Sequence, residues 1–348
     1  MASGVSAARA RIGASQRGED EGKSPRESTA TGSCVAALVA GGPAVEIAAR
    51  AARRPRRRAA PAYSPARPNP HNAKSDMGFD VPQTTLVQLN FYPLKSARGI
   101  ALDAAELDDF GIRNDRRWMV VDPDGEMVTQ REEPRLALIV PKLSSGRLIL
   151  TAPGVGELAL PLGGADGPRL GVRIWRDRVA GAIVQEPATA WISEYLGAPR
   201  RIVYMPDDAF RPIDARYSPP GRRVSFADGF PFLLISAEAL DELNARLDSP
   251  LPMDRFRPNL VVRGAGAHAE DGWRRIRIGD VAFDVVKPCA RCVITTTDQA
   301  TGERGKEPLR TLATYRNRGG KVLFGQNLIH AGPGALRLGD AVAVLETR

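Results

Sequence analysis

The sequence predicts a mainly β protein, a β-barrel with peripheral helices. Short runs rich in β-branched and aromatic residues recur along most of the chain, and turn residues separate them at the spacing typical of a β-sheet or barrel. Only three segments place apolar residues at helical spacing. The chain has no Gly-x-Gly-x-x-Gly or Walker loop, the phosphate-binding motifs of common nucleotide-binding folds. Its 348 residues are enough for two domains.

The first strands are predicted soon after Met77. Thr85–Phe91 leads into a loop that holds a proline, a hydroxyl and two cations. Trp118–Val121 is followed by Asp122-Pro123-Asp124-Gly125, a strong turn signal that predicts a hairpin with residues 126–131. Four further strands are predicted in this half: Arg147–Ala152, Glu157–Pro161, Val172–Trp175 and Val179–Val184.

Three helices interrupt this pattern, and their apolar faces are expected to pack into the core. They are Pro187–Leu196 with Gly197 as its stop, a helix capped by Ser236 that runs to Pro250, and Pro308–Asn317. Further strands are predicted around the last two helices: Leu260–Arg263, a strand into Val286, and Ala341–Leu345.

The basic charge of the chain is concentrated at its N-terminus. Residues 1–76 carry 13 Lys/Arg and 6 Asp/Glu, a net charge of +7 out of the chain's total of +9. The segment lacks the apolar pattern needed to offset the entropy of ordering, so residues 1–80 are predicted to be a disordered basic leader. An over-extended start before Met77 and a targeting segment are the alternatives, although Glu19-Asp20-Glu21 is unusually acidic for a transit peptide.

The same composition limits partners and compartment. The nearly neutral remainder gives no reason to expect a nucleic-acid partner. The apolar run Cys34–Ala40 is too short for a membrane span, so none is expected. Three cysteines, only two of them close together, give no disulfide framework, which favours the reducing cytoplasm.

Cys289-Ala290-Arg291-Cys292 is the stretch most typical of chemistry. A guanidinium beside a cysteine favours the thiolate, the form that binds metal or attacks electrophiles. The β-branched run Val293–Thr297 predicts a strand directly after the pair, which would place a sulfur at the strand's start. Zinc would need further ligands nearby, and a thioredoxin-like pair normally precedes a helix. Two half-buried structural thiols and a single thiolate ligand of a cofactor metal also stay open.

Several cations lie at predicted strand edges beside turn residues, and not on helix faces. A phosphate-bearing cofactor needs cations, hydroxyls and backbone N–H groups that converge from separate loops. These groups are available at Lys95-Ser96, Arg116, Asp228-Gly229 and Arg257-Pro258-Asn259. Spacing alone does not bring them together.

Six motifs in order resemble the MOSC family, named after the C-terminal domain of molybdenum cofactor sulfurases. They are Phe91-Tyr92-Pro93-Leu94-Lys95-Ser96, Asp115-Arg116-Arg117-Trp118-Met119-Val120, Glu133-Pro134-Arg135-Leu136, Phe256-Arg257-Pro258-Asn259, Cys289-Ala290-Arg291-Cys292 and Lys306-Glu307-Pro308-Leu309. Their order is most similar to the mitochondrial amidoxime-reducing component and its bacterial YcbX-like counterparts. The resemblance implies a MOSC N-terminal β-barrel domain at residues 84–205, packed on a MOSC β-barrel domain at residues 206–348.

The resemblance also implies a molybdopterin cofactor with molybdenum. In the family the second cysteine of the motif, here Cys292, ligates the metal and is catalytic; a soft thiolate suits that metal. The matching pterin- and phosphate-binding positions are Lys95, Ser96, Arg116, Arg257 and Asn259, with Asp228 and Gly229 in the corresponding loop. Arg291 is expected to tune the metal from beside its ligand. Ala290 departs from the family, because amidoxime-reducing relatives have serine there.

The implied activity is two-electron reduction of N-hydroxylated compounds such as amidoximes and hydroxylamines. We expect no iron–sulfur cluster in this chain, which lacks the four cysteines of the ferredoxin-like domain of some bacterial relatives. Electrons would come from a separate donor protein of the ferredoxin, flavodoxin or cytochrome type. The alternative is a sulfur carrier in which a cysteine holds a persulfide.

Overall fold

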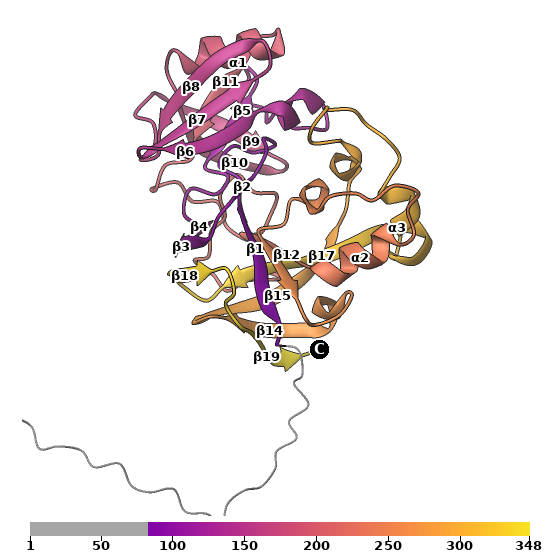
Figure 1. Cartoon of the computed structure of the whole chain (residues 1–348). Helices are drawn as coiled ribbons and strands as arrows, with labels where there is room; N and C mark the ends of the chain where they lie inside the picture. Colours follow the sequence, from indigo (N-terminus) through magenta and orange to yellow (C-terminus); the bar gives the residue numbers. More distant parts are fainter. Residues whose placement is uncertain (1–82) are drawn as a thin grey trace, which may run out of the picture. The chain divides into compact units, whose positions relative to one another are not determined.

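The computed structural model describes residues 83–348 and confirms the mainly β class (Figure 1). The leader expected over residues 1–80 lies outside the described residues. The largest sheet has nine strands, in the order β19 (Val342–Thr347), β14 (Trp273–Ile278), β15 (Val281–Ala290), β17 (Lys321–His330), β12 (Phe232–Ser236), β13 (Leu260–Arg263), β1 (Thr85–Phe91) and β2 (Ile100–Ala101), with β16 (Asn317–Arg318) paired to β17.

The remaining described strands form three smaller sheets. A four-stranded sheet has the order β5 (Trp118–Val121), β11 (Arg201–Tyr204), β10 (Asp177–Ile183) and β9 (Arg169–Ile174). Two three-stranded sheets follow the orders β18 (Gly334–Arg337), β3 (Ala104–Asp108), β4 (Gly111–Ile112) and β6 (Val140–Ser144), β7 (Arg147–Ala152), β8 (Val155–Pro161). The helices are α1 (Ala188–Leu196), α2 (Ala237–Asn244) and α3 (Leu309–Tyr315), and the 3₁₀ segments are η1 (Pro134–Leu138), η2 (Met253–Phe256), η3 (Ala269–Gly272) and η4 (Val293–Thr296).

The nine-stranded sheet curls back on itself. A bridge joins Thr85 in β1 to Ala341, just before β19. Two hydrogen bonds support this seam: Leu86 N–H donates to the Asp340 carbonyl (2.9 Å), and Val342 N–H donates to the Thr84 carbonyl (2.8 Å). Buried apolar side chains of this sheet form one core together with residues of β3, β4 and β18, and closure removes a long unpaired edge.

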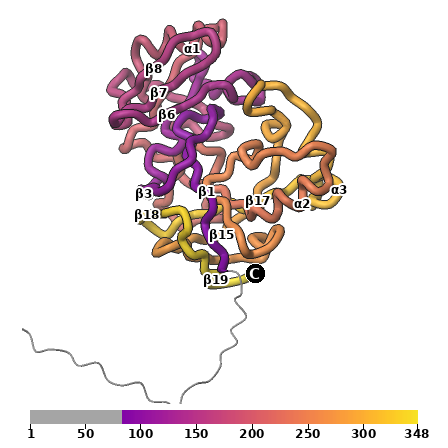
Figure 2. The backbone as a smooth tube through the Cα atoms, viewed as in Figure 1, coloured from indigo at the N-terminus to yellow at the C-terminus, as the bar shows by residue number. Residues whose placement is uncertain are grey.

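β1 comes first in the described chain but lies in the sheet of the C-terminal half. It pairs antiparallel with β13, with Leu89 opposite Leu260. Figures 1 and 2 show this indigo strand running among orange and yellow segments. The domain division at 84–205 and 206–348 stays a prediction, and β1 from the first range shares a sheet with strands of the second.

A second apolar core joins β5, β7, β8 and β11 with α1. α1 buries Trp191, Ile192, Tyr195 and Leu196, the face that the helical spacing predicted. Gly197 ends it in the left-handed region (φ 65°), where its N–H donates to the Glu194 carbonyl, so the glycine stop is confirmed.

Two predicted elements are present but shorter than expected. The helix capped by Ser236 ends at Asn244 and not at Pro250, because the Asn244 amide binds both the N–H (2.9 Å) and the carbonyl (3.1 Å) of Leu251 and folds the chain back. The hairpin predicted after the turn at residues 122–125 is present but short: Val121 forms an antiparallel bridge with Met127, and Val128 N–H donates to the Val120 carbonyl. It does not reach residue 131, because the chain turns again at Thr129, whose carbonyl accepts the Glu133 N–H; β5 also pairs with β11.

No helix within residues 83–348 combines the length and the apolar character that crossing a membrane requires.

The buried carboxyl of Glu270 in η3 gives a first prediction. Its Oε1 accepts the Ser236 N–H (3.1 Å), while Oε2 has no partner and the residue is 0% exposed. Burial raises the pKa of Glu270, only partly offset by the Ser236 hydrogen bonds. The folded state therefore binds this proton more tightly than the unfolded chain does. Stability contributed by the protonated form is present at low pH and is lost as the pH rises through the folded pKa.

Glu270→Gln should therefore gain stability relative to the unmodified protein as the pH rises, because the amide keeps an acceptor for Ser236 and carries no charge. Urea unfolding of both proteins at pH 5 and pH 8 measures this, and the difference in free energy of unfolding should shift in favour of the variant at pH 8. Glu157→Gln, at an exposed position of β8, is the matched control. A difference that stays constant with pH would contradict the assignment.

Candidate functional site

One cavity is lined by every site residue named from the sequence. The predicted members are Lys95, Ser96, Arg116, Asp228, Gly229, Arg257, Asn259, Arg291 and Cys292. They come from the loops after β1, before β5 and before β12, from the end of η2 and the start of β13, and from the segment after β15. The structure therefore brings together groups that sequence spacing could not connect, while their roles stay predictions.

The two cysteines lie at the end of a strand and not at the start of one. Cys289 is near the end of β15, and Cys292 directly precedes η4. The strand expected at Val293–Thr297 is wrong, because threonine hydroxyls bind the backbone locally. Thr295 Oγ1 donates to the Cys292 carbonyl (3.0 Å) and Thr296 Oγ1 to the Val293 carbonyl (2.8 Å), which favours a turn over an extended strand.

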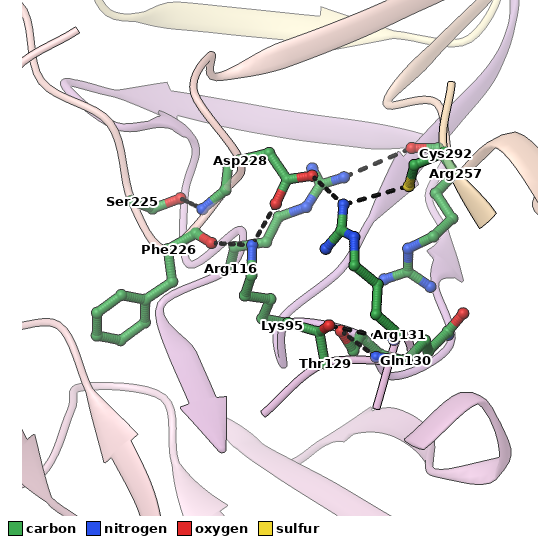
Figure 3. A network of polar contacts seen from close by, with 12 residues as sticks. Lys95, Arg116, Thr129, Gln130, Arg131, Ser225, Phe226, Asp228, Arg257 and Cys292 are labelled. Atoms are coloured by element: carbon green, nitrogen blue, oxygen red, sulfur yellow. Dashed lines mark hydrogen bonds and ion pairs between the residues drawn. The ribbon is translucent and has the colours of Figure 1, made fainter. Parts of the chain in front are cut away.

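Each of the two cysteine sulfurs within residues 83–348 accepts a hydrogen bond from a different arginine. Arg291 Nη1 donates to Cys289 Sγ (2.9 Å), and its Nη2 donates to the Phe256 carbonyl (2.7 Å). Arg131 Nη2 donates to Cys292 Sγ (3.2 Å), as Figure 3 shows. The guanidinium that contacts the predicted metal ligand is therefore Arg131 from the N-terminal half, whereas the adjacent Arg291 serves the other cysteine.

Asp228 is held between two cations at the centre of this network (Figure 3). Lys95 Nζ donates to Asp228 Oδ1 (2.6 Å) and to the Phe226 carbonyl (2.8 Å), and Arg131 Nη2 lies 3.8 Å from Asp228 Oδ2. The Asp228 side chain is 60% exposed, and the nearby cations Lys95 and Arg131 hold its pKa well below its usual range against some desolvation. Burial lowers the pKa of Lys95, and Asp228 partly offsets this. The pair is a fixed, charged wall of the cavity.

A second hydrogen-bond network orients the Arg116 side chain. Its Nη1 donates to Asp115 and to Asn259 Oδ1 (2.8 Å), and its guanidinium lies 4.4 Å above the Tyr92 ring. Asn259 is 1% exposed, and its Nδ2 donates to the Asn90 carbonyl (3.2 Å). The Asn259 amide is thus engaged with the protein, which suits a residue that positions Arg116.

Arg257 differs from these cations because its guanidinium forms no ion pair with the described residues 83–348. It lies 4.5 Å from the centre of the Tyr92 ring, beside Arg116. Enclosure lowers the pKa of Arg257 to about 10, with Tyr92 opposing and Arg116 adding to the effect. A cation left without a counter-charge among like charges favours an anionic ligand.

Three of the predicted positions have backbone in the left-handed region that favours glycine. Ser96, Arg116 and Arg257 have φ values of 71°, 50° and 55°. Such a conformation costs about 1–3 kcal/mol for a non-glycine residue and is typically kept where function needs it. Three such residues around one cavity support a functional site.

Ser96 and Gly229 also line the cavity. Ser96 is 6% exposed, its Oγ accepts the Gln130 N–H (3.3 Å), and its carbonyl accepts Gln130 Nε2 (2.6 Å). Ser96 is therefore partly engaged in holding the loop that carries Arg131. At Gly229, an added Cβ would meet no atom within 4 Å, so that part of the cavity is open.

Sequence reasoning missed Arg131 and several neutral members of the lining. The neutral members include Phe230, Phe256, Cys289, Thr295 and Asn327. Phe256 and Cys289 lay inside quoted motifs but were not predicted to bind the cofactor. Arg131 stood two residues before the Glu133-Pro134-Arg135-Leu136 motif, and that proximity was the available signal.

The charge of the lining fits a phosphate-bearing cofactor. Its ionisable side chains comprise five cations (Lys95, Arg116, Arg131, Arg257, Arg291) and the one carboxylate of Asp228. Arg131 Nη1 and Arg291 Nε are buried without a hydrogen-bond partner. Donors left unpaired beside a thiol match a ligand that offers phosphate oxygens and a soft metal. Within residues 83–348, no cluster of three or more His, Cys, Asp or Glu residues that could hold a metal by itself is found.

The chain matches two family descriptions in order. Residues 83–199 match the "MOSC N-terminal beta barrel domain", and residues 221–343 match the "MOSC domain".

Curated relatives include mitochondrial and plant proteins. Mitochondrial amidoxime-reducing component 1 of Mus musculus is 37% identical over 280 residues, which covers 75% of this chain and 82% of the relative. The Homo sapiens protein of the same name is 35% identical over 291 residues, with coverage of 75% and 83%. Molybdenum cofactor sulfurase of Oryza sativa subsp. japonica is 33% identical over 270 residues, which covers 69% of this chain and 32% of the relative.

Proposed function

The chain belongs to the MOSC family, and on that premise we propose that it is a molybdenum-cofactor-dependent oxidoreductase that reduces N-hydroxylated compounds such as amidoximes and hydroxylamines. The observation that carries the proposal is the meeting of a free cysteine, Cys292, with five cations in one cavity. The names of the relatives at 35–37% identity support the amidoxime part of it.

The residues of the cavity divide the work of binding. Cys292 would hold the molybdenum through its sulfur, and Arg131 would fix that sulfur through the 3.2 Å hydrogen bond. Arg257 and Arg116 would bind the anionic part of the cofactor, with Asp115 and Asn259 aiming Arg116. When bound, the cofactor supplies two-electron redox chemistry, while the protein binds, orients and tunes it.

Lys95 and Asp228 would hold a fixed pair of opposite charges at the cavity wall. Because the pKa of Asp228 is held low, this carboxylate stays ionised and is no proton donor at neutral pH. It would instead orient Arg131 and Lys95, whose N–H groups face it at 3.8 Å and 2.6 Å. Gly229 leaves the adjacent space open for the ligand.

The electron donor is proposed to be a separate protein of the ferredoxin, flavodoxin or cytochrome type. The compartment is proposed to be the cytoplasm from the cysteine usage, whereas the two relatives at 35–37% identity are named mitochondrial. Subcellular fractionation of the tagged full-length protein tests this assignment directly.

Metal content together with turnover tests the proposed function. We expect the protein, purified from a host that makes the cofactor, to contain molybdenum in proportion to protein and to release a fluorescent oxidised pterin. With an artificial electron donor it should reduce benzamidoxime and a hydroxylaminopurine. Folded protein that contains neither molybdenum nor pterin from such a host would overturn the proposal.

A sulfur carrier is the second candidate function. Both described cysteines line the same cavity, each beside an arginine, and one relative is named a molybdenum cofactor sulfurase. Cys289 or Cys292 would then carry a persulfide, and mass spectrometry of the intact protein would detect one added sulfur removable by thiols. Stoichiometric molybdenum favours the reductase, and a persulfide without molybdenum favours the carrier.

A further inference from the structure

One aromatic ring of the cavity lining packs against a ring outside the lining. Three phenylalanines line the cavity, and two of them, Phe232 and Phe256, are only 1% and 0% exposed. Phe230 is partly exposed and packs edge-on against the partly exposed Tyr217, with ring centres 5.6 Å apart and an interplanar angle of 78°. A partly exposed ring that lines a cavity offers its surface to a ligand, whereas a buried ring serves the core.

Lys287 places a positive charge beside these rings. Its Nζ lies 5.1 Å from the centre of Tyr217 and 5.9 Å from that of Phe230. Among residues 83–348 this ammonium group forms no ion pair. The Lys287 carbonyl accepts a hydrogen bond from Asn327 Nδ2 (3.1 Å), and Asn327 lines the cavity. We refer to Tyr217, Phe230 and Lys287 as the ring platform.

The ring platform is chemically distinct from the inner cations. Lys95 and Arg131 contact Asp228, and Arg131 also contacts Cys292. Arg257 and Arg116 lie over Tyr92 and are assigned to the anionic part of the cofactor. Lys287 is outside this set, so its charge is left for a ligand that enters past Phe230.

We propose that the ring platform binds the substrate, and that the preferred substrates are planar aromatic N-hydroxylated compounds that carry a carboxylate. The ring of such a compound packs on Phe230, and its carboxylate pairs with Lys287. The attraction of Lys287 to the ring faces keeps the ammonium group beside the rings. This inference rests on the proposed function and adds to it a substrate class.

Three amidoximes test the ring contact of Phe230 and the charge contact of Lys287 separately. Benzamidoxime offers the ring alone, 4-carboxybenzamidoxime adds the carboxylate, and acetamidoxime has neither. Lys287→Met should lower the ratio of kcat/KM for the carboxylate compound to that for benzamidoxime by about fivefold, the scale of one partly exposed ion pair. Phe230→Leu should lower the ratio of kcat/KM for benzamidoxime to kcat/KM for acetamidoxime by about fivefold, the scale of one aromatic contact.

A binding measurement gives a second readout that does not depend on turnover. Titration calorimetry of the molybdenum-loaded protein with the product 4-carboxybenzamidine should show a Kd about fivefold higher in Lys287→Met. Lys142→Met, at an exposed position of β6, is the matched control and should change neither ratio nor Kd. Thermal unfolding checks that each variant is folded, and Tyr217→Leu replaces Phe230→Leu if the latter is not.

The possible outcomes distinguish this inference from the proposed function. Unchanged ratios and Kd in Lys287→Met and in the ring variant would overturn the substrate class while leaving the reductase assignment intact. An unmodified protein that holds molybdenum but reduces none of the three amidoximes would overturn the proposed function, and the substrate class with it. Loss of the carboxylate preference in Lys287→Met alone would support the charge contact.

Discussion

Cys292→Ser is expected to abolish amidoxime reduction, whereas Cys289→Ser should retain most of it. Serine offers molybdenum a hard, poorly ionised hydroxyl in place of a soft thiolate. The cations of the cavity stay in place, so the variant should keep part of its pterin. Cys289 lies two residues from Arg291 in the chain and accepts its hydrogen bond, away from Arg131. Its replacement removes one contact of Arg291 and no proposed ligand.

The two cysteine variants are compared in one assay, with benzamidoxime, an artificial electron donor, and molybdenum and pterin contents measured on the same preparations. Equal loss in both variants would indicate a redox disulfide. Lower thermal stability with full activity would indicate structural thiols. If Cys292→Ser is fully active and Cys289→Ser is inactive, the metal ligand is Cys289 and not Cys292. If both variants are active, the proposed molybdenum mechanism is contradicted.

The second large effect is expected at Arg257, whose guanidinium has no ion pair within the described chain. If it binds the anionic part of the cofactor, Arg257→Ala removes charge-assisted hydrogen bonds of about 1.5–3 kcal/mol each. Cofactor binding should weaken by roughly tenfold to a hundredfold. The fold should persist, because Arg257 holds no other described side chain by an ion pair.

Dialysis followed by molybdenum and pterin analysis measures this retention. Arg257→Lys keeps the positive charge but loses the planar guanidinium. Its cofactor content should therefore lie between that of the unmodified protein and that of Arg257→Ala. Arg113→Ala is the matched control, since Arg113 forms only an exposed ion pair with Glu106 (3.3 Å). If Arg257→Ala contains as much molybdenum and pterin as the unmodified protein, Arg257 does not bind the cofactor.

The fold class was predictable because short strands and their turn residues are local signals. Thr85–Phe91, Arg147–Ala152 and Leu260–Arg263 are strands with the predicted bounds. The central strand β17 was missed. Gly325 adopts a φ of 81° in its middle, and the next residue, Gln326, is 0% exposed and donates to Asp271 Oδ1 (2.7 Å). A buried polar residue with a distant partner breaks the alternation by which such a strand is recognised.

The candidate site was predictable from the family motifs and not from local pattern. Each predicted residue lines the cavity, but no spacing rule connects Lys95 with Asp228, whose side chains meet 133 positions apart. Arg131 was missed for the same reason: its side chain contacts Cys292, 161 positions away. Contacts between residues so far apart in sequence depend on how the two halves of the chain pack. A single sequence carries no local pattern that predicts this packing.

The place of β1 in the C-terminal sheet has a consequence for how the protein is made. β1 leaves the ribosome early, yet Asn90 at its end binds Asn259, 169 positions later, and Thr85 bridges to Ala341 near the end of the chain. The α1 region and its small sheets can fold while β1 still lacks these partners. Pairing at such separation slows folding and leaves a strand edge open to the wrong partner. β1 therefore cannot complete its pairing until β13 and the last residues of the sheet have been made.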